Sequence, residues 1–156
     1  MYFHHRLRCA PRAWKTVAAH IASVSAPWPE TRGCSLYGIW RSQIGRPRDE
    51  LTVITVWQAP PADSDVAPLF DGIADIVRHS AVAIMPTMRP ASAEPPRRQG
   101  NYAFRWFKTP EQHWPEFLDL CTAAWPDFES AYDSQIVGLW RATPDENGIV
   151  RSLLID

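Results

Sequence analysis

The segment Gly38-Ile39-Trp40-Arg41 occurs again, with Leu in place of Ile, as Gly138-Leu139-Trp140-Arg141. The same offset of 100 residues aligns Trp14 with Trp114. Self-similarity at a fixed spacing is typical of a structural unit that occurs twice in one chain. The sequence therefore predicts two related halves, each organised around a strand that contains this segment.

The residues around the first segment predict strands and an amphipathic helix. Residues 2–8, 33–40 and 51–57 are rich in aromatic and β-branched side chains, and a Gly- and Pro-containing turn at 45–49 separates the last two. Between the first two strands, apolar residues recur with helical spacing at Trp14, Val17, Ala18, Ile21 and Val24. Gly38, in the middle of a strand, predicts a bulge or a close backbone approach.

A second helix and a fourth strand are expected to complete the first half. Asp63, Ser64 or Asp65 can cap this helix. Its apolar face would consist of Val66, Leu69, Phe70, Ile73, Ile76 and Val77. Residues 81–85 form a short apolar run that is typical of a strand. The resulting order, βαββαβ, is the ferredoxin-like arrangement, in which both helices cover one face of an antiparallel sheet.

The second half repeats the first four elements and then ends. We expect a first unit at 1–88, a Pro- and Arg-rich linker at 89–100, and a truncated βαββ unit at 101–156. Its helix begins near Thr109, and its strands are expected at 102–108, 135–141 and 149–155. Because the final helix and strand are missing, residues 149–155 should leave an unprotected sheet edge. We therefore expect a homodimer that involves this edge.

Composition excludes several classes of protein. The chain has 156 residues, 46% of them hydrophobic, and a formal net charge of -1, so neither nucleic acid nor a membrane surface is expected as a partner. The three cysteines, Cys9, Cys34 and Cys121, lack metal-ligand spacing and suit reduced thiols. The N-terminus lacks the pattern of a signal peptide. We expect a cytoplasmic protein.

The motifs of several enzyme classes are absent from the sequence. It contains no P-loop, G-x-G-x-x-G, H-E-x-x-H or G-x-S-x-G segment. His4 and His5 are neighbours on a strand and point to opposite faces, so they cannot jointly bind one metal ion. We expect no metal and no bound cofactor, and no catalytic residue can be assigned.

The 8 tryptophans predict either a thick aromatic core or an aromatic-lined pocket, because an indole is costly to leave in water. In the pocket interpretation a few polar groups orient a ligand among apolar walls. The candidate lining residues are Trp40, Trp57, Trp106 and Trp140, with His4, Arg6 and Arg105 as the polar groups. In the alternative interpretation the same tryptophans are core residues.

These segments resemble the NIPSNAP family of the dimeric α+β barrel superfamily. The first strand of that family commonly reads Tyr-x-Leu-Arg-x-Tyr, which is similar to Tyr102-Ala103-Phe104-Arg105-Trp106-Phe107 and, more loosely, to residues 2–7, where His5 replaces the arginine. Its Gly-x-Trp strand, Gly-containing turn and strand ending in Trp resemble Gly38-Ile39-Trp40, Gly45 and 51–57. The resemblance implies an α+β barrel made of two antiparallel ferredoxin-like sheets, here from the two halves of one chain.

The superfamily that these residues resemble has mixed functions. It contains monooxygenases that need neither metal nor flavin, isomerases, cyclases, haem-binding enzymes and proteins without demonstrated chemistry. One hypothesis is therefore a barrel that binds, and oxygenates or rearranges, a small apolar or aromatic molecule. The other is a non-catalytic interaction protein with a filled interior. In haem-degrading relatives an axial histidine comes from the second helix region, so His79 resembles a haem ligand, although no haem-attachment motif supports it and a polar helix end is the alternative explanation.

Overall fold

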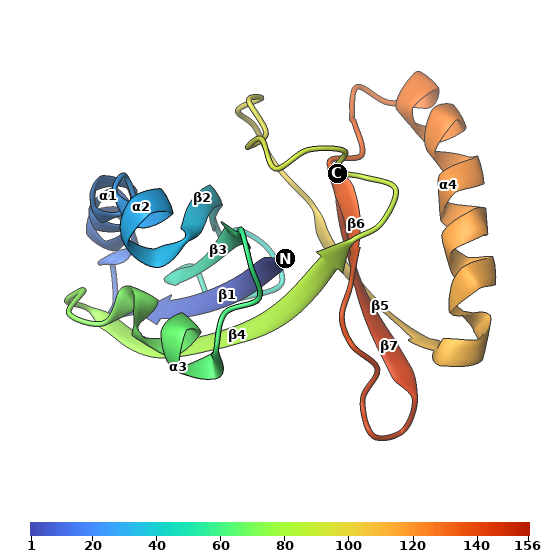
Figure 1. The fold of residues 1–156 in the computed structure, drawn as a ribbon. Coiled ribbons are helices and arrows are strands. Elements are labelled where there is room, and N and C mark those ends of the chain that lie inside the picture. Colours follow the sequence, from blue (N-terminus) through green and yellow to red (C-terminus); the bar gives the residue numbers. More distant parts are fainter. The chain divides into compact units, whose positions relative to one another are not determined.

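The computed structural model describes the backbone of residues 1–156 and every side chain except that of Asp63. The chain forms two compact units, Met1–Ala83 and Ile84–Asp156. Along the chain the elements are β1 (Tyr2–Cys9), α1 (Trp14–Val24), α2 (Trp28–Arg32), β2 (Cys34–Arg41), β3 (Glu50–Trp57), α3 (Asp63–Val66), the 3₁₀ helix η1 (Ala67–Phe70), β4 (Ile76–Pro86), β5 (Phe104–Pro110), the 3₁₀ helix η2 (Glu111–His113), α4 (Trp114–Ala131), β6 (Gly138–Arg141) and β7 (Ile149–Ile155). Figure 1 shows these elements.

The strands hydrogen-bond in the order β2-β3-β1-β4-β6-β7-β5. In the first unit, the order β2-β3-β1-β4 is that of a ferredoxin-like sheet, and β3 pairs antiparallel with both β1 and β2. Strand β4 continues into the second unit, where Met85 and Pro86 pair with β6. The α+β class with antiparallel pairing, expected from the sequence, is confirmed.

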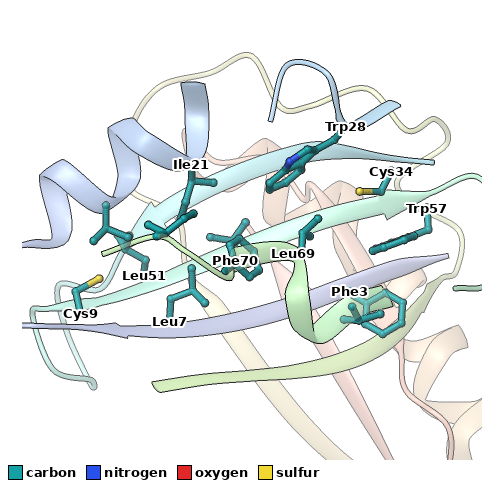
Figure 2. Packing of buried hydrophobic residues seen from close by; sticks show 14 residues of the cluster. Phe3, Leu7, Cys9, Ile21, Trp28, Cys34, Leu51, Trp57, Leu69 and Phe70 are labelled. Atoms are coloured by element: carbon teal, nitrogen blue, oxygen red, sulfur yellow. The ribbon is translucent and has the colours of Figure 1, made fainter. Parts of the chain in front are cut away.

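The core of the first unit lies between its helices and one face of its sheet, which we call the helix face. Alternate residues of β1, such as Phe3 and Leu7, and of β3, such as Leu51 and Trp57, point to this face and are at most 9% exposed. Helix α1 adds its predicted apolar stripe, and α2 and η1 add three large side chains, Trp28, Leu69 and Phe70 (Figure 2). Each large apolar side chain buried in this way contributes about 1.5–3 kcal/mol.

The connection after α1 contains a second short helix. Helix α1 ends at Val24, and residues Trp28–Arg32 form the separate short helix α2, with Pro29 in its tolerant first turn. Gly33 ends this helix with a φ of 66°, a left-handed conformation that glycine adopts without steric cost. The extra helix brings Trp28 into the core.

The predicted long second helix is wrong. Only α3 and η1, each four residues long, are helical, and the chain then turns at Gly72 and Asp75, whose φ angles are 79° and 68°. Strand β4 begins at Ile76 and has 11 residues, where the sequence predicted a short strand at 81–85. Asp65 caps α3, since its Oδ2 accepts a hydrogen bond from the Ala62 backbone N–H at 3.2 Å, whereas the side chain of Asp63 lies outside the described residues.

The second unit packs one long helix on its sheet. Helix α4 has 18 residues and continues through Pro126, so the helix does not divide as α1 and α2 do in the first unit. Its residues pack on Leu139 and Leu154, and Phe117 lies 5.3 Å from Phe107 between ring centroids. In Figure 1, α4 lies alongside β5 and β7. This covered side is the helix face of the second unit.

Strand β7 is not the sheet edge that the sequence predicted. It pairs with β6 on one side and with β5 on the other, from Phe104–Ile155 to Pro110–Ile149. Strand β5 instead stands last in the hydrogen-bonding order. The prediction that residues 149–155 offer a free edge for dimerisation is therefore wrong, because both sides of their backbone are already paired.

The Pro- and Arg-rich stretch between the halves is tied to α4 and to the segment that follows it. Arg89 Nη1 lies 2.6 Å from Glu129 Oε1, and its guanidinium stands 5.2 Å from the centre of the Trp125 ring. Arg98 forms an ion pair with Asp133 at 2.9 Å. These contacts fix the stretch to one end of the second unit. In the part of the chain that the structure describes, no helix has both the length and the apolar character needed to cross a membrane.

Candidate functional site

In each copy of the repeated segment, the tryptophan ring occupies the space that a side chain on the glycine would need. A Cβ added to Gly38 would stand 2.2 Å from a ring atom of Trp40, and one added to Gly138 would stand 2.6 Å from the same atom of Trp140. Real Cβ atoms do not approach so closely, so each glycine lets the tryptophan two residues later fold back over its own strand. A register shift between Leu36 and Gly38 also confirms the predicted bulge.

The arginine that ends each segment points to the helix face and covers the first residue of a helix. Arg41 stands 4.0 Å from the ring centre of Trp14, and Arg141 stands 4.6 Å from that of Trp114. The Trp114 indole N–H also donates to Ser152 Oγ at 2.9 Å. Because the arginine and the tryptophan before it alternate across the strand, one segment stabilises both faces of each sheet.

The face of the first unit's sheet that points away from its helices, which we call the opposite face, brings together three of the candidate residues. Trp40 pairs with Thr52, and Thr52 pairs with Arg6, so the three side chains form one row across β2, β3 and β1. In the next row His4 lies beside Ile54. Directly paired residues have Cβ atoms about 4.5–5.5 Å apart. An aromatic, a hydroxyl, a guanidinium and an imidazole thus share one small area.

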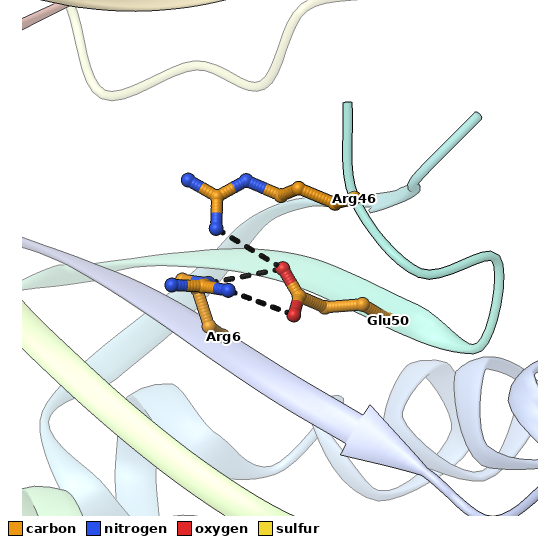
Figure 3. Close-up of polar contacts among 3 residues, drawn as sticks. All are labelled: Arg6, Arg46 and Glu50. Carbon is orange, nitrogen blue, oxygen red and sulfur yellow. Dashed lines mark hydrogen bonds and ion pairs between the residues drawn. The ribbon is translucent and has the colours of Figure 1, made fainter. Parts of the chain in front are cut away.

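A carboxylate completes this area. The Arg6 guanidinium donates two hydrogen bonds to Glu50, from Nε at 2.9 Å and from Nη2 at 2.8 Å. Arg46 Nη1 approaches the same carboxylate at 3.4 Å (Figure 3). The Glu50 side chain is 7% exposed, against 42% for Arg6. Burial alone would raise the pKa of Glu50, but the hydrogen bond and charge of Arg6, together with Arg46, lower the pKa below its ordinary value. Glu50 is therefore ionised.

Two of the predicted lining residues lie on the helix faces instead. Trp57 is 4% exposed in the core of the first unit, where its Nε1–H donates to Thr55 Oγ1 at 3.0 Å. Arg105 pairs with Leu154, a residue of the α4 core, and forms an ion pair with Asp156 at 2.9 Å. The prediction that Trp57 and Arg105 belong with Trp40 is corrected, because the strand registers place them on the other side of each sheet.

The opposite face of the second unit is apolar where that of the first is polar. Trp106 and Trp140 both pair with Leu153, so the row across β5, β7 and β6 is Trp-Leu-Trp. Arg151 stands 4.6 Å from the ring centre of Trp106. The structure therefore places the seven predicted residues in three settings: His4, Arg6 and Trp40 in the polar area, Trp106 and Trp140 in the apolar row, and Trp57 and Arg105 on the helix faces.

Sequence reasoning missed a pair of histidines on the helix face of the first unit. His79 lies inside β4, not at a helix end, and its Nε2 is 3.1 Å from Nδ1 of His5. His5 Nε2 is 2.9 Å from Thr55 Oγ1, and both His5 and Thr55 are 0% exposed. Since one nitrogen of each contact must carry a hydrogen, the pair can share a proton. His79 therefore does not occupy the helical position that the haem-binding relatives imply.

Burial keeps this histidine pair neutral. Desolvation, followed by the charges of His79 and His4, lowers the pKa of His5 to about 3. Burial also lowers the pKa of the half-buried His79, although Asp71 opposes the shift. Among the described residues, no group of three or more His, Cys, Asp or Glu side chains is arranged to hold a metal ion.

Comparison with known proteins supports the fold and goes no further. No protein-family model matches the chain, and no curated protein matches its sequence. The structure is similar to the crystal structure of a protein from Lactobacillus acidophilus NCFM that is named as a candidate monooxygenase, with a TM-score of 0.55 and 10% sequence identity. The match covers 99% of this chain and 75% of that chain. At this identity the likeness shows the fold alone.

Proposed function

We propose that this chain is a NIPSNAP-like cytoplasmic protein that binds a small apolar or aromatic molecule against the opposite face of its first unit. The observation that carries the proposal is the ionised Glu50 carboxylate, nearly enclosed and held by Arg6, in the same area as Trp40 and His4. A buried ion pair adds little net stability, because the cost of removing two charges from water offsets their attraction. Its presence beside His4, Thr52 and Trp40 fits a role in orienting a ligand.

Each group in this area has a chemical role that suits such a ligand. Trp40 offers an aromatic surface, and the part of Arg6 that remains exposed can donate to a carbonyl or phenolate oxygen. His4 can accept a proton, and Arg6 can stabilise the negative charge that forms when a proton leaves a carbonyl compound. Oxygenation, isomerisation or cyclisation without a bound metal or flavin is the chemistry that this set supports.

A thermal-shift screen against small aromatic and polyketide-like molecules tests the proposal. A ligand at 100 times its Kd stabilises a protein by about 2.7 kcal/mol, which is a shift of several degrees. We expect the shift to disappear in Arg6→Gln and to persist in Arg78→Gln, a control at an exposed residue of β4. A hit that shifts both variants as it shifts the parent protein would reject the site, and no hit in the panel would reject the class of ligand.

A non-catalytic interaction protein is the second candidate, and one observation favours it. On the opposite face of the first unit, Tyr2 and Tyr37 contact each other edge-on at 5.4 Å between ring centroids, and they are 4% and 2% exposed. Ile54 on the same face is 0% exposed. Side chains already fill this part of the face. Under this alternative, Arg6→Gln would weaken binding to a protein partner and would leave every small-molecule shift unaffected.

We also propose that the chain forms a homodimer, now without assigning the contact to residues 149–155. Light scattering after size exclusion, at tens of micromolar, measures the mass directly. A dimer should have twice the 17.7 kDa of the chain. A single species of monomer mass would reject the dimer.

A further inference from the structure

A pocket of about 300 Å³ lies on the helix side of the first unit, between the α1–α2 corner and the segment that follows η1. Its walls include Trp28, Leu69 and Ile73, which are 5%, 6% and 9% exposed, and Val24 at the end of α1. This volume is at the lower end of the range for ligand pockets, which are typically apolar with a few polar groups. The space therefore suits a molecule with a single ring.

The indole of Trp28 gives the pocket a rigid wall and a hydrogen-bond donor. Its ring is held edge-on against Phe70, with 6.0 Å between centroids and an angle of 79° between the planes. Within the described part of the chain, its Nε1–H makes no hydrogen bond. This N–H is not one of the fully buried donors without a partner, so it reaches solvent and can donate to an acceptor atom on a bound molecule.

Arg32 supplies a positive charge on the α1–α2 side of the pocket. His20 and Arg32 line this side, and Arg32 forms no ion pair with the residues that the structure describes. Thr31 is already engaged, since its hydroxyl donates to the Pro27 carbonyl at 2.7 Å. Asp71 lies on the other side and acts electrostatically on His79. The charged residues that line the pocket are therefore Arg32 on the α1–α2 side and Asp71 on the other.

We propose that this pocket is a second ligand site, which binds a small aromatic carboxylate. The ring packs between Trp28, Leu69 and Ile73, and the carboxylate meets the Arg32 guanidinium, whose fork matches a carboxylate in shape. One acceptor of the ligand takes the Trp28 N–H. This site lies on the helix side of the unit, whereas His4, Arg6 and Trp40 lie on the opposite face, so the two proposals stand or fall separately.

Benzoate is the probe, with benzamide and benzylamine as matched compounds of similar size that are neutral and cationic. A titration followed by NMR on the Trp28 indole N–H should show saturable binding of benzoate, with a Kd on the order of 1 mM for so few atoms. Arg32→Gln should weaken benzoate binding about tenfold, the effect expected when one charge-assisted contact of about 1.4 kcal/mol is lost. Benzamide should bind the parent protein about as weakly as benzoate binds Arg32→Gln.

Two further variants keep the test decisive. Trp28→Phe retains a ring and removes the N–H, so benzoate should bind several-fold more weakly to it, as followed by calorimetry. Arg48→Gln removes one positive charge, as Arg32→Gln does, but at an exposed residue that does not line the pocket. This control variant should bind benzoate as the parent protein does. The proposal is overturned if benzylamine binds more tightly than benzoate, if Arg32→Gln and Arg48→Gln bind benzoate equally, or if none of the three compounds shifts the Trp28 signal up to 10 mM, a concentration about ten times the expected Kd.

Discussion

The two units place different chemistry on the same framework. Strands β1 and β3 pair in the register of β5 and β7, so Arg6 and Thr52 of the first unit correspond to Trp106 and Leu153 of the second. His4 corresponds to Phe104 in the same way. The first unit thus has polar groups at three positions where the second has apolar ones. The backbone pairing does not require polar side chains at these positions, so their presence in one unit alone points to function there.

The two units also differ at a pair of corresponding charged residues, Glu50 and Arg151. Glu50 pairs with Arg8, and Arg151 pairs with Lys108, so Glu50 and Arg151 correspond. In the first unit the residue at this position forms an ion pair with Arg6, and in the second Arg151 stacks on Trp106. The same two positions hold an ion pair in one unit and a cation–π contact in the other. The framework therefore tolerates either interaction.

The largest effect is expected at the glycines that the two units share. In Gly38→Val and in Gly138→Val the new side chain must displace the indole of Trp40 or Trp140, since even a Cβ would lie 2.2 or 2.6 Å from the ring. We expect each variant to lose about 3 kcal/mol of unfolding free energy, the upper range for overpacking. Urea unfolding followed by circular dichroism measures both. A large loss in only one of them would break the equivalence of the two segments.

The next largest effect should differ between the two units, at the corresponding positions Glu50 and Arg151. Glu50→Gln leaves Arg6 without its charged partner in a site where the carboxylate is 7% exposed, and should cost about 2–3 kcal/mol. Arg151→Gln, at an exposed cation–π contact, should cost less than about 1 kcal/mol. The double variant Arg6→Met/Glu50→Leu should recover most of the loss, because apolar pairs replace buried ion pairs at little cost. Equal losses in the two single variants would contradict the difference between the faces.

Acid should destabilise the first unit through His5. Its pKa is lowered to about 3 in the folded protein, whereas an unfolded histidine has a pKa near 6.5, so the unfolded chain binds a proton first as the pH falls. Stability is therefore complete above pH ~6.5 and is lost between this value and pH ~3. The loss from pH 7 to pH 5 should be about 2 kcal/mol. In His5→Gln most of this dependence should vanish, and the part that remains should come from His79, whose pKa burial also lowers. An unchanged pH profile in that variant would mean that another group titrates.

The smallest effect is expected where the units agree. Arg41→Ala and Arg141→Ala each remove a guanidinium from a tryptophan ring, at 4.0 and 4.6 Å, and should cost about 0.5–1 kcal/mol each. Guanidinium chloride unfolding of the two variants side by side measures the costs. Lysine at either position should restore part of the loss, since it keeps the charge. Losses that differ by more than twofold would show that the two contacts are not equivalent.

The repeated segment and the alternation within each strand could be predicted from the sequence alone. Side chains two residues apart in a strand must share a face, which is why His4 and Arg6 were expected together and why His4 and His5 were expected apart. Helix α1 was predicted from its spacing for a similar reason, since apolar residues at helical intervals form one stripe. These are local regularities, and they do not depend on which strands become neighbours.

Only the tertiary structure decided which side of each strand faces the helices. The loop between β2 and β3 could accommodate more than one register, and a shift of one residue reverses every side chain of a strand. Trp57 was misplaced for this reason, whereas alternation alone already puts Arg105 on the face opposite that of its neighbour Trp106. The contact between His5 and His79 joins residues 74 positions apart, and it exists because Gly72 and Asp75 end the helical region and start β4 at Ile76. Burial of the pair, and the lowered pKa of His5 with it, follows from long-range packing, which no local pattern in the sequence encodes.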